Sequence, residues 1–382
     1  MSQARGRAGA IMKVSARHRC GNLVSNCCPV KLREQLSSKA RRIVVKLGTG
    51  LLTDSQNQLA RTEIKQLVGQ LAALQRDGRE VLVVSSGAIA AGMSALGLAA
   101  RPKELAQLQA CAAIGQCRLM AMYDEAFAGF NIHVAQVLLT HDDLRNRTRH
   151  LNTQHTLDTL LRRGVVPIIN ENDTVSVDEI KFGDNDRLGA LVAALIDADL
   201  LIILSHIEGL LDREKRVVAT VSEVSREIEA LADGTDRHTS VGGMVSKLSA
   251  AKIVTRAGIA MIIANGERAN VLADLLAGKE IGTIFLPGAK KLAGRKRWIA
   301  FFQRTAGAVQ VDNGARAALC ANGKSLLAKG VVGAEGDFAA GDAVSIQDKN
   351  GVEFARGLAK VASNELKTVA GVIVHRDDLV IL

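Results

Sequence analysis

The sequence predicts an α/β protein in which a parallel sheet is covered by helices on both faces and is followed by a smaller, mainly β domain. From residue 43 onward, short apolar runs alternate with amphipathic segments of helix length, which is the pattern of parallel strands joined by crossover helices. The alternation stops near Pro287. A chain of 382 residues is too long for one ordinary hydrophobic core, so two domains are expected.

The first domain contains six predicted strands, each a short run dominated by Val, Ile, Leu or Ala. They are Ile43–Leu47, Glu80–Val84, His133–Leu139, Val165–Ile169, Leu200–Leu204 and Ala260–Ala264. The segments between them have apolar residues at helical spacing. The predicted helices are Glu63–Leu74, a Gly/Ala-rich helix from Gly87, Leu105–Phe127, Leu151–Leu161, Leu191–Ile196 and Met244–Arg256.

After Pro287 the pattern changes. Residues 288–297 are rich in Lys and Arg and are expected to form a basic linker. Short β-like runs punctuated by glycines follow, at Ala308–Val311, Ala343–Ile346 and Val372–Val374. They predict a small, mainly β domain over residues 298–382.

The positive charge of the chain is concentrated in its first 42 residues. These carry ten Lys or Arg and a single acid, Glu34, so they hold +9 of the formal net charge of +10. The rest of the chain is nearly neutral, which weakens a nucleic-acid interpretation of the overall basicity. We expect residues 1–40 to form a disordered basic extension. The alternatives are an organelle transit peptide and a start codon placed too far upstream.

Cysteine, histidine and hydropathy patterns exclude several classes of protein. Six cysteines without framework spacing favour a reducing compartment, so a cytoplasmic location is expected. No apolar run is long enough to span a bilayer, and no membrane partner is expected. The histidines lack metal-ligand spacing, so we predict no protein metal site and assign His150 and His155 to the solvated surface.

Residues 169–186 are the most concentrated polar segment of the chain. Two clusters, Asn170–Asp173 and Gly183–Asp186, follow the predicted strand Val165–Ile169 and are joined by Val175–Ile180, which alternates like a hairpin. Carboxylates and carboxamides are costly to hold together unless they bind a cation, an ammonium group or helix N–H groups. In open α/β sheets, ligands bind where strands end. The alternative is two capped turns that satisfy only the local backbone.

Three turns marked by glycine or serine have the features of anion-binding sites. Lys46–Gly50 ends a predicted strand, where backbone N–H groups and the Lys46 ammonium can approach an anion. Ser85–Gly92 and Gly242–Lys247 each open a predicted helix, whose first N–H groups and dipole attract phosphate or carboxylate. The alternatives are a tight turn, an ordinary Ser86 N-cap and a common Gly-Gly turn.

In this order, the segments resemble the glutamate 5-kinase family of the amino-acid kinase superfamily. The similarity rests on Val45–Thr49, Ser86–Gly92, Ile169–Asp173, Ile180–Asp186 and Gly242–Lys247. The part that begins at Arg295-Lys296-Arg297-Trp298 resembles a PUA domain. The resemblance therefore implies an amino-acid kinase domain at 41–287, built as a three-layer αβα sandwich with a largely parallel central sheet, and a mainly β PUA domain at 298–382.

The resemblance also implies roles for particular residues. Lys46 and Lys247 are expected to stabilise the transferring phosphoryl group from opposite sides, with Asp186 orienting both lysines. Ser86, Gly87, Asp173 and Asn185 correspond to glutamate-binding positions. The positions implied for the nucleotide are Lys46, Gly48, Ser205, His206, Val241, Gly242, Gly243, Met244, Val245, Ser246 and Lys247. The piece at Val175–Ile180 is expected to be a flap over the substrate.

The implied reaction is phosphorylation of the γ-carboxylate of L-glutamate by ATP, giving L-glutamyl 5-phosphate for proline biosynthesis. Phosphoryl transfer depends on positioning and charge neutralisation, and the attacking carboxylate is already ionised, so no general base is needed. Mg²⁺ is expected to be bound to the ATP phosphates. Feedback inhibition by proline and a homo-oligomer, a dimer or a tetramer, are also implied.

Two positions depart from the family pattern. Ser205-His206 stands where the family has Thr-Asp at a nucleotide contact, and Val241 stands where a threonine is usual. Altered nucleotide affinity with retained activity is therefore expected.

The alternative functions are another small-acid kinase of the same fold, or an RNA-binding or sensor protein with a disabled kinase domain. Residues 298–382 hold nine basic and nine acidic residues, which makes RNA binding by the PUA domain the weaker expectation, although the question stays open.

Overall fold

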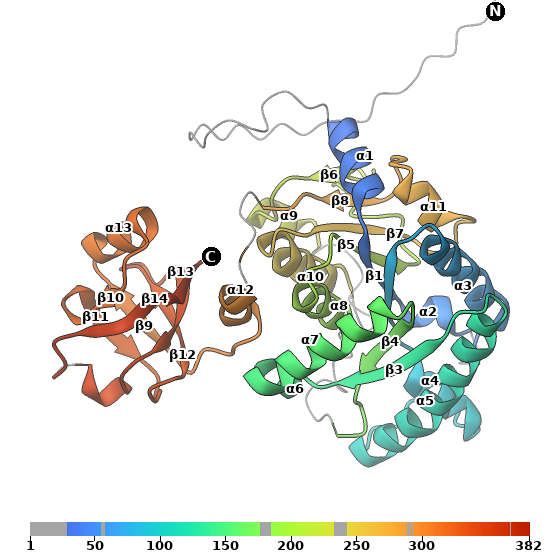
Figure 1. Ribbon diagram of the computed structural model, residues 1–382, viewed down its shortest axis with the longest axis horizontal. Coiled ribbons are helices and arrows are strands. Elements are labelled where there is room, and N and C mark those ends of the chain that lie inside the picture. The colour runs from blue at the N-terminus through green and yellow to red at the C-terminus, as the bar shows by residue number, and fades with distance from the viewer. Residues whose placement is uncertain are drawn as a thin grey trace, which may run out of the picture.

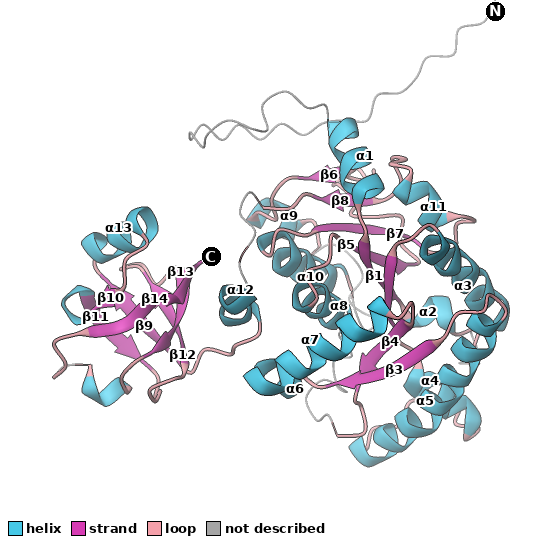
Figure 2. Ribbon diagram, viewed as in Figure 1, coloured by secondary structure: helices cyan, strands magenta, loops and turns pink. Residues whose placement is uncertain are grey.

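A computed structural model of the protein describes residues 29–54, 58–175, 185–232, 243–288, 292, 294–366 and 368–382. It consists of a large α/β domain and a smaller β-rich domain, with helix α12 (Gly294–Phe301) between them (Figure 1). Figure 2 shows helices on both sides of the larger sheet. None of the helices in the described ranges is long and apolar enough to cross a membrane.

The large domain is built on an eight-stranded sheet in the order β3-β4-β2-β1-β5-β7-β8-β6. Its central strand, β1, is parallel to both of its neighbours, β2 and β5. One pair breaks the pattern, because β8 runs antiparallel to β7. The strands are β1 (Arg42–Leu47), β2 (Glu80–Val84), β3 (Val134–Leu139), β4 (Val166–Glu171), β5 (Leu200–Ser205), β6 (Thr220–Val221), β7 (Ala260–Asn265) and β8 (Thr283–Phe285).

Alternation along each strand divides the apolar side chains between two cores. In β1, Val44 belongs to one core, and Ile43 and Val45 belong to the other. The first core includes α7 (Arg147–Arg162), α8 (Asn185–Leu195), α10 (Met244–Arg256) and α12; the second includes α3 (Arg61–Arg76), α5 (Leu105–Ala128) and α11 (Val271–Leu276). Both faces of the sheet are thus buried under helices, which confirms the predicted three-layer αβα sandwich.

Shorter helices complete the large domain. They are α2 (Thr49–Leu52), α4 (Ala88–Ala95), α6 (His141–Arg145) and α9 (Arg226–Ala230). Helix α6 follows β3 directly and begins with a capping box, in which Thr140 and Asp143 satisfy each other's backbone N–H groups.

The second domain contains a six-stranded sheet in the order β10-β14-β13-β12-β9-β11 with its own apolar core. The strands are β9 (Gly307–Val311), β10 (Leu326–Leu327), β11 (Val331–Glu335), β12 (Ala343–Gln347), β13 (Glu353–Ala359) and β14 (Val372–Ile381). Its helical segments are α13 (Asn313–Asn322), Ala328–Gly330 and Ser363–Glu365. The mainly β domain is confirmed, with β14 extending well beyond the predicted Val372–Val374.

The predicted basic linker is wrong in its second half, since residues 294–297 form the first turn of α12. Arg297 is buried and forms an ion pair with Asp197, and Trp298 is buried in the core that also contains α8. Helix α12 contacts α8 on one side and β13 and β14 on the other. Basic residues do not make this segment a free linker, because the apolar run that follows them anchors the helix.

The predicted disordered extension is also wrong for residues 29–40; residues 1–28 lie outside the described ranges. Helix α1 spans Pro29–Lys39, with Leu36 against the second core and Ala40 within it. The buried Arg33 donates hydrogen bonds to the carbonyls of Ala219 and Ile281. Tertiary contacts hold this helix, so a search for local periodicity does not detect it.

His150 is another correction. The sequence predicts a solvated surface position for it, but only 4% of it is exposed, and its ring centroid lies 4.6 Å from that of Phe302. Its Nδ1 lies 3.1 Å from the Leu144 carbonyl oxygen. Burial, with a smaller contribution from Arg147 and Arg297, lowers the pKa of His150 to about 4, although the Leu144 contact opposes the shift. His155 is exposed, as predicted.

Candidate active site

The candidate active site lies at the carboxyl ends of the central parallel strands. Lys46 is near the end of β1, Ser86 follows β2, and Asn170 and Glu171 end β4. Because β1 is flanked by β2 on one side and β5 on the other, this is the position where open α/β sheets form ligand clefts. Helix α8 crosses here, with Gly189 packed against the stem of Lys46.

Three charged side chains from different elements meet at this edge. Lys46 Nζ lies 2.7 Å from Asp186 Oδ1, and Lys247 Nζ lies 3.0 Å from Asp186 Oδ2. Asp186 is in the first turn of α8, and Lys247 is in the first turns of α10. Ser246 also donates a hydrogen bond, of 3.3 Å, to Oδ2. One carboxylate therefore fixes two ammonium groups on its two oxygens.

The charge state of this group follows from its surroundings. Asp186 is 1% exposed, Lys46 6% and Lys247 4%. Burial by itself raises the pKa of the Asp186 carboxyl, but the charges and hydrogen bonds of the two lysines outweigh it, and the net effect is a lowered pKa. Two ammonium ions around one carboxylate leave a net charge of one positive unit in a poorly solvated position. Such a site favours an incoming anion.

Asn185, directly before Asp186, connects the strand ends. Its Nδ2 lies 2.8 Å from the Ser85 carbonyl oxygen, 2.9 Å from Ser86 Oγ and 3.1 Å from Asn170 Oδ1. Its other amide atom, Oδ1, is buried and has no hydrogen-bond partner within the described part of the chain. A buried acceptor left in this state is rare in proteins and indicates a missing donor.

Gly87 begins helix α4 with a left-handed backbone, φ +89°. A side chain is strained in this conformation, so glycine lets the chain turn sharply from β2 into the helix. The turn leaves Ser86 beside Asn185 and the first N–H groups of α4 beyond it. Ser86, Gly87 and Asn185 are thus brought together as the sequence predicted.

Asp173 lies two residues beyond β4 and is half-buried, in contact with other polar groups. The predicted flap Val175–Ile180 lies outside the described residues except for Val175, which is exposed. The first residues of the cluster Gly183–Asp186, Gly183 and Asp184, also lie outside them.

The residues predicted to contact the nucleotide lie beside the lysines. Gly48 donates its backbone N–H to the Leu204 carbonyl at 3.1 Å, which joins the turn after β1 to the end of β5. Ser205 ends β5 and is half-buried. Gly243 caps α10, Met244 is buried and Val245 is exposed. Val241 and Gly242 lie outside the described residues.

His206 covers the turn after β1. Its ring occupies the space where a side chain on Gly50 would be, since a Cβ at that position would lie 1.8 Å from His206 Nε2. The other ring nitrogen, Nδ1, lies 2.8 Å from Glu267 Oε1. The imidazole and a nearby carboxylate therefore stand where the family pattern has an acid.

The residues that support Asn185 have no role predicted from the sequence. Asn170 accepts from Asn185 and donates to Gln116 Oε1 at 2.9 Å, and the Ser85 hydroxyl lies 2.9 Å from the Tyr123 hydroxyl. Gln116 and Tyr123 come from α5 and are buried. Gln116 could have been found, because it is a polar residue on the otherwise apolar stripe of that helix.

No group of three or more His, Cys, Asp or Glu side chains within the described ranges is arranged to hold a metal ion. The carboxylate of Asp186 is already held by two lysines.

The fold and the site together define the class of protein, the amino acid kinases. The profile of the amino acid kinase family matches residues 41–265, and that of the PUA domain matches residues 307–376. The first match includes Lys46, Ser86, Asn185, Asp186 and Lys247.

Relatives that match nearly the whole chain identify the particular family within this class. The glutamate 5-kinase of Geobacter sulfurreducens is 46% identical over 373 residues, which cover 92% of this chain and 100% of that protein. The glutamate 5-kinase of Myxococcus xanthus is 47% identical over 365 residues, covering 90% and 97%. The glutamate 5-kinase of Moorella thermoacetica is 45% identical with the same coverage. The chain belongs to the glutamate 5-kinase family.

Proposed function

We propose that this protein transfers the γ-phosphoryl group of ATP to the γ-carboxylate of L-glutamate, giving L-glutamyl 5-phosphate. The observation that carries the proposal is the Lys46–Asp186–Lys247 cluster beside the unpaired Asn185 Oδ1. Membership of a kinase family implies the use of ATP. The cluster supplies the positive charge that a transferring phosphoryl group requires.

Lys46 and Lys247 neutralise charge on the phosphoryl group as it moves between donor and acceptor. Their Nζ atoms reach Asp186 from two different elements, so they are held in place before substrates bind, and little reorganisation is needed during transfer. Asp186 is a positioning residue: it pairs with both ammonium groups and fixes their locations.

Ser86, Gly87, Asp173 and Asn185 bind the amino acid. The N–H groups at the start of α4, after Gly87, receive a carboxylate of glutamate. Asp173 and Asn185 Oδ1 accept hydrogen bonds from its ammonium group. The γ-carboxylate has an ordinary pKa near 4.3 and is ionised at neutral pH, so it attacks without a general base.

The nucleotide lies along Gly48, Ser205, His206 and the segment 241–247. Gly243 and the start of α10 direct N–H groups toward its phosphates. Mg²⁺ bound to the phosphates of the nucleotide would neutralise further charge on them.

The wider role that we propose is the first step of proline biosynthesis, in the cytoplasm, with proline as feedback inhibitor and a homo-oligomer as the active form. Names of relatives support the pathway. The free cysteines Cys111, Cys117 and Cys320 fit a reducing compartment.

A hydroxamate assay tests the activity. Purified protein with ATP, Mg²⁺, L-glutamate and hydroxylamine is expected to form γ-glutamyl hydroxamate, and a Lys247→Met variant is expected to lose this product. Aspartate and N-acetylglutamate serve as matched acceptors. Product from either of these acceptors, and none from glutamate, would indicate that the protein is another small-acid kinase. No product with any acceptor, together with salt-sensitive RNA binding, would favour an RNA-binding or sensor role.

A further inference from the structure

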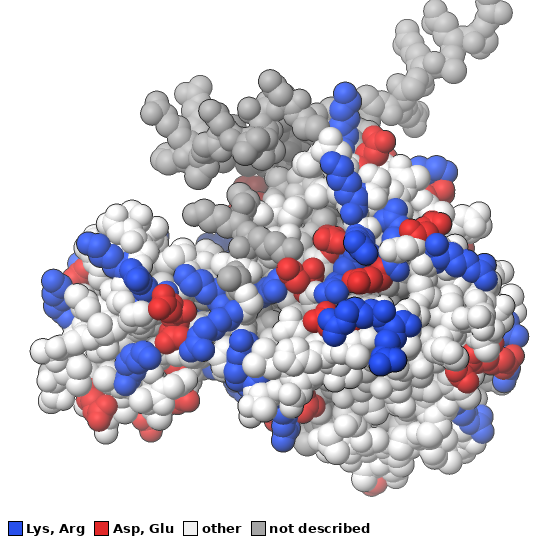
Figure 3. Space-filling view, viewed as in Figure 1, with Lys and Arg blue, Asp and Glu red and all other residues white. Residues whose placement is uncertain are grey.

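Three side-chain amides, those of Asn185, Asn170 and Gln116, form a continuous hydrogen-bonded amide chain beside the candidate glutamate site. Asn185 Nδ2 donates to Asn170 Oδ1 at 3.1 Å, and Asn170 Nδ2 donates to Gln116 Oε1 at 2.9 Å. Gln116 is 7% exposed and Asn170 is 2% exposed. Charged side chains are spread over the face of the molecule shown in Figure 3, whereas the amide chain is uncharged and mostly buried.

Backbone groups fix the direction of the amide chain. Turning a side-chain amide by 180° exchanges its donor and its acceptor. The Glu171 backbone N–H, which can only donate, lies 2.9 Å from Asn170 Oδ1. The Ser85 carbonyl oxygen, which can only accept, lies 2.8 Å from Asn185 Nδ2. Turning either amide would bring two donors or two acceptors together, so the observed direction is the stable one.

The direction decides what the two ends of the amide chain offer. Asn185 Oδ1 is a buried acceptor at one end and Gln116 Nε2 is a buried donor at the other, and neither has a hydrogen-bond partner among the residues that the structure describes. An unpaired buried amide group costs free energy. A side chain needed only to fill space would be apolar, as Ala112 and Leu119 are on the same side of α5. The contact that accounts for a glutamine here is the hydrogen bond that it accepts from Asn170.

Helix α5 holds the amide chain at two points. Gln116 and Tyr123, two turns apart, are both buried. The Tyr123 hydroxyl lies 2.9 Å from the hydroxyl of Ser85, whose carbonyl fixes Asn185. Burial raises the pKa of Tyr123, so its hydroxyl stays neutral at working pH. One helix therefore contacts the ends of both β2 and β4 and keeps the amide chain in place.

We propose that Gln116 is a positioning residue that makes the site selective for acids with a hydrogen-bond donor on the α-carbon. The inference rests on the proposed binding of the glutamate ammonium group at Asn185 Oδ1. By accepting from Asn170, Gln116 keeps Asn170 Oδ1 turned toward Asn185 Nδ2, and this keeps Asn185 Oδ1 turned toward the substrate.

The fixed acceptor distinguishes between acids of the same length. An ammonium group on the α-carbon donates to Asn185 Oδ1. A 2-oxo acid presents a second acceptor at this point, and a dicarboxylic acid without an α-substituent leaves the oxygen unpaired. A site built to pair with a donor discriminates strongly against ligands that lack it.

Binding of L-glutamate and of glutarate to the full chain, measured by isothermal titration, tests the proposal. Glutarate differs from glutamate only in lacking the α-ammonium group, and its weaker binding is measured by competition with glutamate. Gln116→Met removes the acceptor at similar side-chain length. We expect it to lower the affinity for glutamate about tenfold and to leave the affinity for glutarate unchanged. Gln116→Glu keeps an acceptor for Asn170, whether its carboxyl group is ionised or protonated, and is expected to retain the preference for glutamate.

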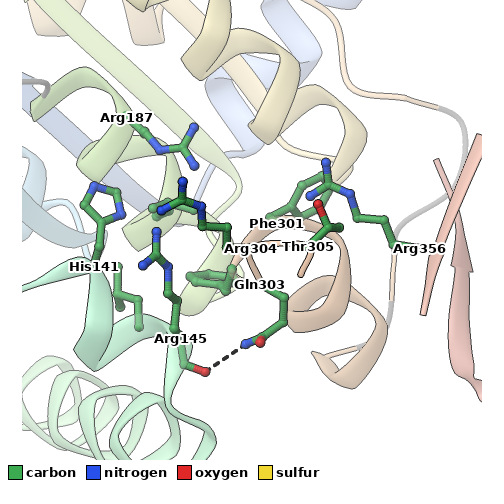
Figure 4. Close-up of a pocket in the computed structure, with 11 residues that line it drawn as sticks. His141, Arg145, Arg187, Phe301, Gln303, Arg304, Thr305 and Arg356 are labelled. Carbon is green, nitrogen blue, oxygen red and sulfur yellow. Dashed lines mark hydrogen bonds between the residues drawn. The ribbon is translucent and has the colours of Figure 1, made fainter. Parts of the chain in front are cut away.

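Gln303→Met is the matched control. Gln303 donates to the Arg145 carbonyl oxygen at 2.8 Å in a pocket between the two domains (Figure 4). This variant also loses one side-chain hydrogen bond of a glutamine, but it leaves the amide chain intact. It is expected to bind glutamate and glutarate as the wild type does.

A Gln116→Met variant with wild-type affinity for glutamate would overturn the proposal. So would an equal loss of affinity for glutamate and glutarate, which indicates a general loss of structure, or a wild type that does not prefer glutamate over glutarate. The hydroxamate assay separates these outcomes from a failure of the proposed function. A wild type that forms no γ-glutamyl hydroxamate contradicts the proposed reaction, while its preference between glutamate and glutarate still reports the amide chain.

Discussion

Asp186 forms ion pairs with two lysines at once, so its removal affects stability and catalysis together. Both of its oxygens are used, one by Lys46 and one by Lys247. Either lysine would be an uncompensated buried charge without it. At the residue scale, this carboxylate is the group on which the geometry of the candidate site depends most.

We expect Asp186→Asn to lower kcat about 10²–10³-fold, because the lysines lose their fixed positions. We also expect a loss of about 3–5 kcal/mol in the free energy of unfolding, since two ammonium groups remain buried with one neutral partner. Steady-state kinetics and urea unfolding measure the two effects. Asp124→Asn, an exposed site on α5, is the control. A folded variant with wild-type kcat would contradict the role of Asp186.

His206 allows a second test at this scale. The ring lies over Gly50 and contacts Glu267, so His206→Asp removes that cover and places a second carboxylate near Glu267. We expect the KM values for ATP and GTP to change while kcat stays similar, because the lysines are untouched. His155→Asp, an exposed histidine on α7, is the control. If the variant has the same KM values for ATP and GTP as the wild type, His206 does not contribute to nucleotide binding.

Helices α4 and α5 cross at two glycines. A Cβ on Gly92 would lie 1.8 Å from the Cys111 carbonyl oxygen, and one on Gly115 would lie 1.7 Å from that of Ala88. Only the absence of side chains lets the backbones approach so closely. Since α4 begins directly after Ser86 and Gly87, this crossing determines where the start of the helix lies relative to Asn185.

Gly115→Ala is therefore expected to displace α4. We expect a loss of about 1–3 kcal/mol in the free energy of unfolding from overpacking, and a higher KM for glutamate with a smaller effect on the KM for ATP. Gly129→Ala, at the end of the same helix, meets its nearest atom at an ordinary 3.5 Å and should change neither quantity. Equal changes in both KM values would indicate a general loss of structure instead of a displaced α4.

The two domains share a core at whole-molecule scale. Trp298, Phe301 and Phe302 of the α12 region pack with α8 of the large domain, and Val380 of β14 belongs to the same cluster. His150 fills this junction, between Leu144 and the ring of Phe302. The junction is thus a continuous apolar contact that also buries the titratable side chain of His150.

This arrangement predicts a loss of stability in mild acid. The pKa of His150 is about 4 in the folded chain and near 6.5 when unfolded, so below pH 6.5 the unfolded state binds a proton that the folded state does not. The contribution of His150 to the free energy of unfolding is fully present above pH 6.5. It falls by about 3 kcal/mol as the pH approaches 4.

Urea unfolding at pH 8, 6 and 4.5 measures this loss. His150→Gln is expected to flatten the pH dependence, while the exposed His155→Gln keeps it. If the wild type and His150→Gln lose the same free energy of unfolding as the pH falls, groups other than His150 cause the loss.

Much of the architecture was predictable because its signals are local. Composition and length predict the runs that form β1, β2, β3, β4, β5 and β7, and all six strands are present. The polar residues that follow them, with Lys46 and Lys247, identified the edge of the sheet that carries the site. Parallel strands end at a common edge, so the order of these segments already implied that they meet.

By itself, the sequence determined the layered fold and the residues predicted for the candidate site, because strands, helices and the polar residues that follow strands can be recognised from local patterns. Only the tertiary structure decided the contacts between distant segments. These are the burial of His150 under α12, the anchoring of α1 by Arg33, and the support of Asn185 by Gln116. Each depends on a partner far away in sequence, and local patterns carry no information about such partners.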